Sequence, residues 1–209
     1  MYTPSAFIEK DLPTLHKQML ATRLALLVTQ GEQGLLASHV PLLLKPDQGL
    51  QGTLYGHLAR ANRQWHDLAS GAEALVIFAG EDAYISPSFY PSKAEHGKAV
   101  PTWNYIAVHA YGQADVFDDA QRLLNVVSQL SDRHEAGRSE PWQVSDAPRD
   151  YIDSMLKAFV GFELPISRLI GQRKLSQNRS TVDQAGVRNG LLANNNSKDH
   201  ALAQLIAKE

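Results

Sequence analysis

The fold is decided by residues 24–57, which read L-A-L-L-V-T-Q-G-E-Q-G-L-L-A-S-H-V-P-L-L-L-K-P-D-Q-G-L-Q-G-T-L-Y-G-H. This stretch holds apolar runs of strand length at 24–30, 35–45 and 50–57, separated by G-E-Q-G and P-D-Q-G. Both separators have the composition of turns. Successive strands with short connections predict an antiparallel meander.

The residues on either side of the meander are mostly strands, with helices inserted among them at irregular intervals. This order favours a closed or partly closed barrel over a doubly wound sheet, and a fold that is mainly β with added helices (α+β). The predicted elements up to residue 117 are helices at 11–23 and 60–70 and strands at 74–80, 83–87 and 102–117, the first two strands being joined by an E-D turn.

After residue 117 apolar residues recur at helical spacing. We predict helices at 118–135 and 148–159, a strand at 160–171 that closes the barrel, and a polar, mostly helical tail over 172–209 that is interrupted by N-G at 189–190 and by N-N-N at 194–196. The chain is therefore expected to form one domain over 1–171 and a C-terminal helical extension over 172–209, packed on the barrel or on a partner subunit.

The composition is that of a globular protein, with 209 residues, 44% hydrophobic and 20% charged. A net charge of -2 gives no overall attraction to nucleic acid or to anionic membranes. The absence of cysteine excludes disulfides and zinc-thiolate sites. The N-terminus does not resemble a signal peptide, and no apolar run approaches the roughly 20 residues of a spanning helix. We expect a cytoplasmic protein that does not engage membranes.

Residues 84–105, Y-I-S-P-S-F-Y-P-S-K-A-E-H-G-K-A-V-P-T-W-N-Y, have the character of a ligand-site loop. Three prolines lie close to Phe89, Tyr90 and Trp103, and prolines lower the entropy cost of holding side chains in place. Long loops in compact domains are often functional. The alternative is an aromatic-rich loop that folds back over its own core.

Residues 54–65, L-Y-G-H-L-A-R-A-N-R-Q-W, predict a strand that passes directly into a helix. The first turns of that helix hold Arg60, Asn62 and Arg63. Backbone N–H groups at a helix start beside an arginine suit a phosphate monoester. The alternative is that the two arginines simply face solvent.

His39 lies within the strand A-S-H-V-P-L, on the face opposite Ser38 and Val40. Pro41 removes a ladder donor, so part of this strand is expected to face a flat ligand instead of a neighbouring strand. Four histidines could suggest a metal, but no two have metal-ligand spacing on one element, so no metal is predicted.

The segment G-Q-R-K-L-S-Q-N-R at 171–179 is basic and contains no acidic residue. It could hold an anionic ligand, contact a protein partner or DNA through residues 172–179, or simply face solvent. The chain contains no G-x-S-x-G, Walker loop, H-E-x-x-H or G-x-G-x-x-G. No catalytic residue is therefore predicted.

Together these segments resemble the PaiB-type FMN-binding proteins, a group of negative transcriptional regulators in the split-barrel flavoprotein superfamily. The resemblance runs nearly end to end. It is carried by M-Y-T-P-S-A-F, S-H-V-P-L-L-L, G-H-L-A-R-A-N-R-Q-W, Y-I-S-P-S-F-Y-P-S-K, V-P-T-W-N-Y, V-H-A-Y-G and K-L-S-Q-N-R.

This resemblance implies a split β-barrel of the FMN-binding type and a homodimer with FMN, or a related flavin, at the subunit interface. Ser38 to Pro41 would lie along the isoalloxazine, and the segment from His57 to Asn62 would surround the phosphate and ribityl chain. The implied cofactor-binding residues are Ser38, His39, Val40, Pro41, His57, Ala59, Arg60, Asn62, Tyr90, Thr102, Trp103, Asn104, Lys174 and Gln177.

Two functions are compatible with this resemblance. One is an FMN-binding transcriptional regulator, whose flavin biases an interaction with a partner. The other is an FMN-dependent oxidoreductase of the flavin reductase or pyridoxamine-phosphate oxidase kind. Fold alone does not separate them. The lack of an evident general acid or base beyond the histidines favours the regulator over the enzyme.

Overall fold

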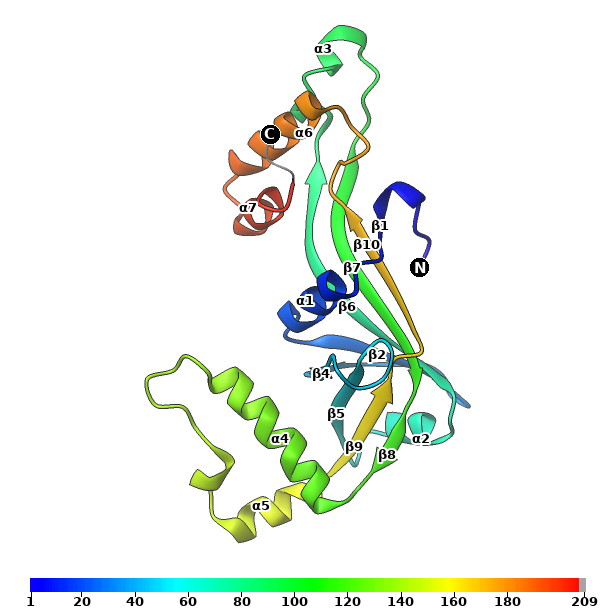
Figure 1. The fold of residues 1–209 in the computed structure, drawn as a ribbon, viewed down its shortest axis with the longest axis vertical. Helices are drawn as coiled ribbons and strands as arrows, with labels where there is room; N and C mark the ends of the chain where they lie inside the picture. Colours follow the sequence, from blue (N-terminus) through cyan, green and yellow to red (C-terminus); the bar gives the residue numbers. More distant parts are fainter. Residues whose placement is uncertain (207–209) are drawn as a thin grey trace. The chain divides into compact units, whose positions relative to one another are not determined.

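The computed structural model in Figure 1 describes residues 1–206. Six strands form one antiparallel sheet in the order β1-β10-β7-β6-β2-β3, and four form another in the order β4-β5-β9-β8. Helices accompany both sheets. Neither sheet closes on itself within residues 1–206. The predicted fold, mainly β with added helices (α+β) and arranged as a split barrel, is confirmed.

The chain forms two compact units. We call residues 16–78 and 109–169 the barrel unit, and residues 1–15, 79–108 and 170 onward the terminal unit. Three strands contribute residues to both units, namely β6 (Glu73–Ile85), β7 (Thr102–Gln113) and β10 (Arg168–Lys174). The division into a domain over 1–171 and an extension over 172–209 stays a prediction.

In the barrel unit, β2 (Ala25–Gly31) and β3 (Gly34–Val40) form an antiparallel hairpin. Alternate side chains of β2 are buried, with Leu27 fully so, because one face of the strand meets the core. The second sheet of this unit pairs β5 with β4 and β9, and β9 with β8. Its strands are β4 (Leu43–Lys45), β5 (Thr53–Ala59), β8 (Asp115–Phe117) and β9 (Phe159–Pro165).

The predicted meander is wrong in its second strand. Instead of one strand over 35–45, β3 ends at Val40 and β4 begins at Leu43 in the other sheet. Pro41, between them, has no N–H to donate to a ladder. The chain therefore leaves the first sheet at this proline and enters the second.

Two helices of the barrel unit, α4 (Ala120–Glu135) and α5 (Arg149–Leu156), confirm the helices predicted after residue 117. Asp119 caps α4, because its carboxylate accepts a hydrogen bond of 2.8 Å from the Arg122 N–H. The buried side chains of α4 form a core cluster with Leu43 and Phe117 of the second sheet. No helix within residues 1–206 is long and apolar enough to cross a membrane.

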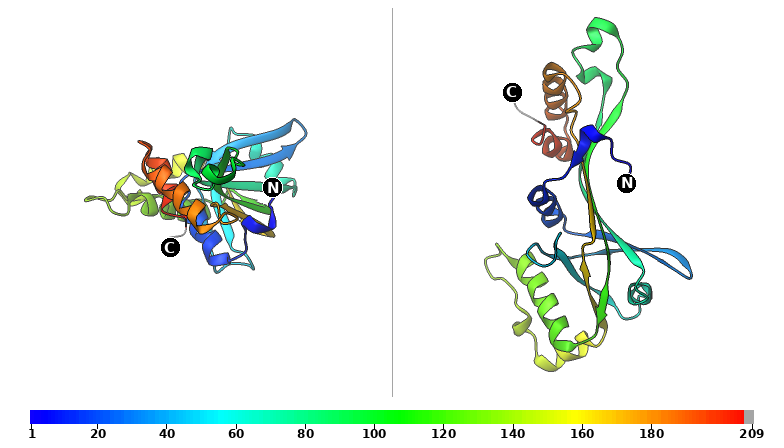
Figure 2. Two further views of the ribbon diagram at one scale, coloured as in Figure 1. Left: turned by 90° about the horizontal axis from the view of Figure 1, so that it is seen from above. Right: turned by 45° about the vertical axis from the view of Figure 1, so that its right-hand side comes forward.

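In the terminal unit, α6 (Thr181–Leu192) and α7 (Ser197–Ala203) lie side by side (Figure 2). Their buried Val187, Leu191 and Leu202 form a core cluster with Ile85 of β6 and Ile106 of β7. Elements with residues in this unit also include η1 (Ser5–Phe7), β1 (Ile8–Glu9), α1 (Leu12–Ala21), η2 (Pro87–Phe89) and α3 (Lys93–His96). The helix predicted at 11–23 is therefore present as α1.

The N-G dipeptide predicted as a loop-like interruption lies inside α6. A Cβ on Gly186 would come within 2.2 Å of the Phe89 carbonyl oxygen, and one on Gly190 within 2.3 Å of the Phe89 ring. These glycines lie about one helical turn apart and allow α6 to pack closely on η2. The tail also begins differently from the prediction, since residues 172–174 belong to β10.

Two other strand predictions need correction. β6 is continuous, so the predicted E-D turn at 81–82 is wrong. The buried side chains are at even-numbered positions in its first half (Ala74, Val76 and Phe78) and at odd-numbered positions in its second half (Ala83 and Ile85). The strand continues through this change.

Residues 160–171 form two strands instead of one. β9 ends at Pro165 in the four-stranded sheet, and β10 begins at Arg168 in the six-stranded sheet. Between them the Ile166 and Ser167 N–H groups donate to the carbonyls of Gly52 and Tyr111, at 3.0 and 2.9 Å. The bend is therefore held by backbone hydrogen bonds outside the ladders.

Candidate functional site

The end of β3 supplies the first group of predicted site residues. Val40 is buried, Ser38 is half-buried and His39 is exposed, as the alternation of a strand requires. The Ser38 hydroxyl accepts a hydrogen bond of 3.0 Å from the Asn62 side-chain amide. The structure therefore joins the end of β3 to the turn after β5, although the sequence separates them by 24 residues.

That turn differs from the prediction, because α2 (Gln64–Ala69) begins four residues later than the predicted helix over 60–70. The Arg60 N–H donates to the Ala158 carbonyl at 2.7 Å, and the Asn62 N–H donates to the Ala59 carbonyl at 2.8 Å. These amides are thus already used. The predicted placement of Arg60 and Asn62 in the first turns of a helix is therefore wrong, whereas the anion site itself stays a prediction.

Arg60 is fixed by backbone carbonyls of the chain that enters β9. Its Nε donates to the Lys157 carbonyl at 2.9 Å and its Nη2 to the Phe159 carbonyl at 3.0 Å. The Asp118 carboxylate lies 3.8 Å from Nη2, and 43% of the Arg60 side chain is exposed. The guanidinium is thereby oriented before any ligand arrives, and within residues 1–206 no hydrogen bond of its Nη1 is found, so this group can donate to an anion.

His57 lies on β5, next to this group. Its ring is 4.8 Å from the ring of Phe159, and its buried Nδ1 has no hydrogen-bond partner within residues 1–206. Burial lowers the pKa of His57, so the neutral form predominates near pH 7. A neutral imidazole can donate or accept one hydrogen bond without adding a charge.

The sequence did not point to Gln64, the first residue of α2. Its side chain is fully buried, and its Nε2 donates to the Leu27 carbonyl of β2 and the Leu36 carbonyl of β3 at 3.0 and 3.2 Å. Its backbone N–H donates to the side-chain oxygen of Asn62 at 3.1 Å. Gln64 therefore positions the Asn62 amide relative to β3, a role that its residue type alone does not reveal.

The terminal unit brings together a second group of predicted residues. Lys174 Nζ donates to the Thr102 hydroxyl at 2.6 Å, and the Asn104 amide donates to the Ser176 hydroxyl at 2.9 Å. The Leu175 N–H donates to the Gln177 side-chain oxygen at 2.7 Å. These contacts tie the end of β10 to the start of β7.

Two features of this second group suit a polar ligand. Asn104 is buried, and its Oδ1 has no hydrogen-bond partner within residues 1–206. Burial and the nearby charge of Arg179 lower the pKa of Lys174. A buried acceptor without a partner and a partly desolvated cation both gain from a ligand that donates or carries negative charge.

The two aromatic residues predicted for the site make other contacts. Trp103 is 54% exposed and packs edge-on against Tyr84, with ring centroids 5.8 Å apart. Tyr90 is buried in the cluster beneath α6, where the Arg179 guanidinium lies 4.9 Å from its ring centre. Their roles toward a cofactor stay predictions, as do those of the other predicted site residues.

No group of three or more His, Asp or Glu side chains among residues 1–206 could hold a metal ion. The candidate site is thus described by two sets of polar side chains, one in each unit. The set in the barrel unit contains an oriented arginine, an amide and a hydroxyl. The set in the terminal unit contains a lysine, an amide and two hydroxyls.

Comparison with known proteins places this chain among flavin-related relatives. A family model described as "Putative FMN-binding domain" matches residues 1–168. The chain is 30% identical over 207 residues to the protease synthase and sporulation protein PAI 2 of Bacillus subtilis, covering 99% of this chain and 96% of that protein. It is 32% identical over 225 residues to the uncharacterized protein AN0679 of Emericella nidulans, covering 91% and 90%.

Among solved structures, the FAD and heme binding protein from Mycobacterium smegmatis is similar in fold. The TM-score is 0.58 at 18% identity, over 80% of this chain and 73% of that one. At this identity the likeness concerns the fold alone. The match over residues 1–168 and the near full-length similarity to PAI 2 establish that the chain belongs to the PaiB-type family, which carries this FMN-binding domain.

Proposed function

We propose that this protein binds FMN and that the barrel unit supplies the phosphate site. The observation that carries the proposal is the hydrogen bond between Asn62 and Ser38, which joins β3 to the turn after β5, together with the oriented guanidinium of Arg60 from the same turn. A phosphate monoester requires a fixed cation and neutral donors, and these side chains provide both. The family match supports a flavin as the molecule that bears the phosphate.

The residues fit the cofactor in their chemistry. Arg60, Asn62 and Ser38 would hold the phosphate and the adjoining ribityl chain, and Val40 and Pro41 would contact the apolar ring. The roles of Lys174, Thr102 and Asn104 toward the flavin stay predictions. FMN, when bound, supplies one- and two-electron transfer chemistry. The chain's residues bind it, orient it and limit the access of water.

We further propose a homodimer in the cytoplasm that acts as a regulator whose flavin biases binding to another macromolecule. The similarity to the protease synthase and sporulation protein PAI 2 supports a regulatory role. The basic segment 172–179 gives weaker support for a DNA contact than its composition suggests, because its basic side chains already have partners within the chain. Lys174 donates to Thr102, Arg179 lies over Tyr90, and Arg173 lies 3.8 Å from the Glu9 carboxylate.

An oxidoreductase is the second candidate. The observation that favours it is the Lys174–Thr102 pair, in which a lysine of lowered pKa lies within hydrogen-bonding distance of a hydroxyl. Such a lysine can hold or donate a proton near a reacting group. Bleaching of protein-bound flavin by NADH or NADPH would support this alternative.

The experiment that tests the proposal is purification followed by flavin analysis. We expect a yellow protein that releases FMN on denaturation, or a colourless one that takes up FMN and quenches its fluorescence. A protein that neither carries nor takes up FMN would contradict both functions. Salt-dependent binding to promoter DNA, weakened by neutralising Arg173 and Lys174, would then support the regulator.

A further inference from the structure

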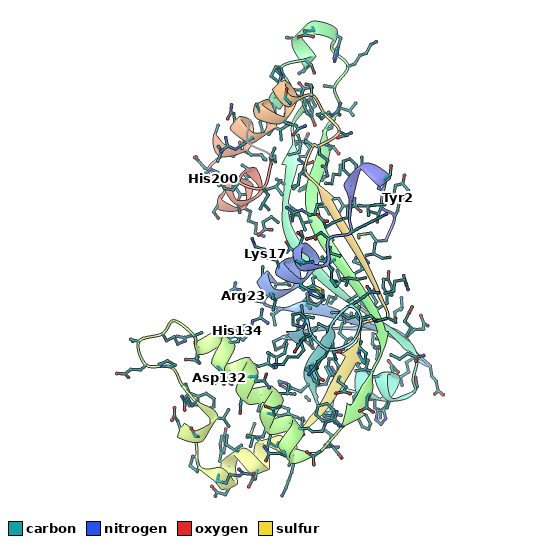
Figure 3. The ribbon with its side chains drawn as sticks, viewed as in Figure 1. Tyr2, Lys17, Arg23, Asp132, His134 and His200 are labelled. Carbon is teal, nitrogen blue, oxygen red and sulfur yellow. The ribbon has the colours of Figure 1, made fainter. Side chains whose placement is uncertain are left out.

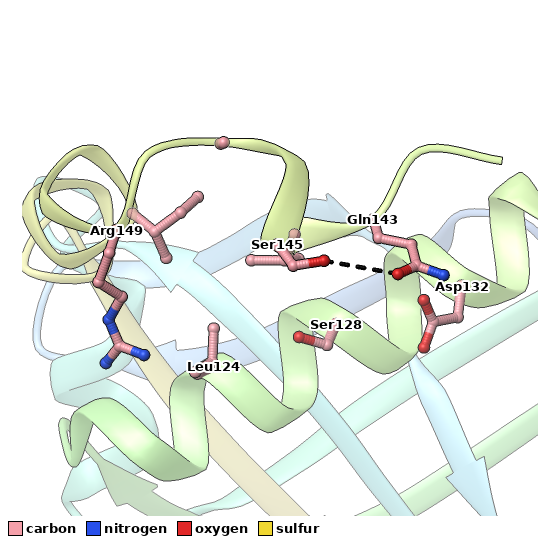
Figure 4. A pocket seen from close by; sticks show the side chains of 9 residues that line it. Leu124, Ser128, Asp132, Gln143, Ser145 and Arg149 are labelled. Carbon is pink, nitrogen blue, oxygen red and sulfur yellow. Dashed lines mark hydrogen bonds between the residues drawn. The ribbon is translucent and has the colours of Figure 1, made fainter. Parts of the chain in front are cut away.

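A cavity of about 590 Å³ lies between α4 and the chain that leads from it to α5 (Figure 4). This volume is within the range of small-molecule sites. From α4 it is lined by Leu124, Ser128 and Asp132, which lie four residues apart and so share one face of the helix. The opposite wall is formed by η3 (Val144–Asp146) and the first turns of α5. None of its lining residues is among those proposed to bind FMN.

One end of this cavity is apolar. Leu124 of α4 and Ile152 of α5 are half-buried and pack against the core cluster that joins α4 to the barrel. Val144 and Ala147 add apolar surface on the opposite wall. This end can therefore take up the hydrocarbon part of a ligand.

The other end is polar and centres on Asp132, which Figure 3 labels near the end of α4. Asp132 is exposed, and no ion pair or hydrogen bond of its carboxylate is found within residues 1–206. Gln143 lies close by, and its side-chain oxygen accepts a hydrogen bond of 3.4 Å from the Ser145 hydroxyl (Figure 4). The carboxylate, this amide and the Ser128 hydroxyl together offer acceptors to a donor group.

The charges of the lining favour a cation. Arg149 lines the cavity at the end away from Asp132 (Figure 4), but its Nε donates to the Asp153 carboxylate at 2.9 Å. Its positive charge is therefore already paired, whereas that of Asp132 is not. The rise of an α-helix over the eight residues from Leu124 to Asp132 sets the two ends about 12 Å apart.

From this geometry we propose that the cavity binds a small, elongated organic cation. Its ammonium group contacts Asp132 and Gln143, and its apolar body lies over Leu124 and Ile152. This is a ligand site separate from the FMN site. The proposal does not depend on FMN binding.

Phenylbutylamine is a suitable probe, because it joins an ammonium group to a phenyl ring through a flexible chain. Phenylbutanol and phenylbutyrate are matched probes without charge and with negative charge. We expect the amine to change backbone amide chemical shifts of residues 124–152 in the full chain, measured by NMR. We expect the alcohol to bind about tenfold or more weakly, since it cannot form the charge-assisted bond.

Measured by calorimetry, the affinity for phenylbutylamine should be about tenfold or more lower in Asp132→Asn than in wild type. Asp150→Asn changes an exposed carboxylate on α5 that does not line the cavity, and it should leave the affinity unchanged. Ser128→Phe should abolish binding by filling the cavity, and circular dichroism checks that each variant is folded. Equal binding of amine and alcohol, tighter binding of phenylbutyrate, or an unchanged affinity in Asp132→Asn would overturn the proposal.

Discussion

Asp183 is buried in the first turn of α6, where its carboxylate accepts hydrogen bonds from the Ser92 N–H at 3.1 Å and the Ser92 hydroxyl at 2.8 Å. Burial alone would raise the pKa of Asp183, but hydrogen bonds with Ser92 and Ser180 and the charge of Arg179 outweigh it, so the pKa is lowered. The resulting stabilisation is present above the unfolded pKa of about 3.9 and is lost as pH falls through the folded pKa.

Ser92→Ala is therefore expected to lower the free energy of unfolding by about 1.5–3 kcal/mol at neutral pH, because it removes a hydrogen bond to a charged group. The loss should shrink as the solution is acidified toward the folded pKa of Asp183. Urea unfolding at several pH values measures both effects. Ser139→Ala, at an exposed position, is the control, and a loss for Ser92→Ala that does not vary with pH would contradict the assignment.

The sequence indicates a candidate site residue where the side chain itself has the chemistry that a ligand needs. The sequence pointed to Ser38, Arg60 and Asn62, and the structure brings Ser38 and Asn62 into hydrogen-bonding contact. It could not reveal that Arg60 is held by the carbonyls of Lys157 and Phe159, because those residues follow it by almost a hundred positions and any residue type offers a carbonyl. Gln64 was missed for the same reason, because its partners are the backbone carbonyls of Leu27 and Leu36, which their residue types do not reveal.

Within the elements, the packing of α6 on η2 depends on Gly186. Gly186→Ala is expected to destabilise the fold by about 1–3 kcal/mol, because the added Cβ meets the backbone carbonyl of Phe89, which cannot rotate away. This cost exceeds the gain in helix propensity, which is at most about 1 kcal/mol. Thermal or urea unfolding measures the change.

Asn189→Ala in the same helix is the matched control. Its side chain is exposed, so the substitution should be neutral or stabilising by a few tenths of a kcal/mol, about the difference in helix propensity. If Gly186→Ala were as stable as Asn189→Ala, close packing would not be the reason for glycine at this position.

Elements were predictable from periodicity, whereas their boundaries depended on contacts that periodicity does not contain. The helical spacing in 118–135 predicted α4 because its buried Leu123, Val126 and Leu130 share one core cluster. N-G was read as a loop signal because glycine serves both for conformational freedom and for close approach, and sequence does not distinguish these uses. Similarly, E-D is typical of a turn, yet it lies within the continuous strand β6, which is hydrogen-bonded to β7 in the sheet.

For the whole molecule, two histidines should make the free energy of unfolding decrease at acidic pH. Burial lowers the pKa of His57 and of His109. The unfolded chain therefore binds protons more readily than the folded one, so the free energy of unfolding should be constant above about pH 7 and fall as pH decreases through about 6.5 toward the folded pKa values.

Urea unfolding of wild type and His57→Gln between about pH 7.5 and 5.5 measures this slope, which the variant should reduce. His134→Gln, at an exposed position on α4, is the matched control and should keep the wild-type slope. A slope in His57→Gln identical to that of wild type would show that His57 does not contribute to it.

The central claim, that Arg60 holds the phosphate of FMN, is tested most directly by titrating wild type and Arg60→Ala with FMN and with riboflavin, which lacks the phosphate. We predict that wild type prefers FMN and that Arg60→Ala weakens FMN binding by about 1.5–3 kcal/mol while leaving riboflavin binding nearly unchanged. Equal affinities of wild type for the two flavins, or an FMN affinity that Arg60→Ala does not alter, would contradict the account.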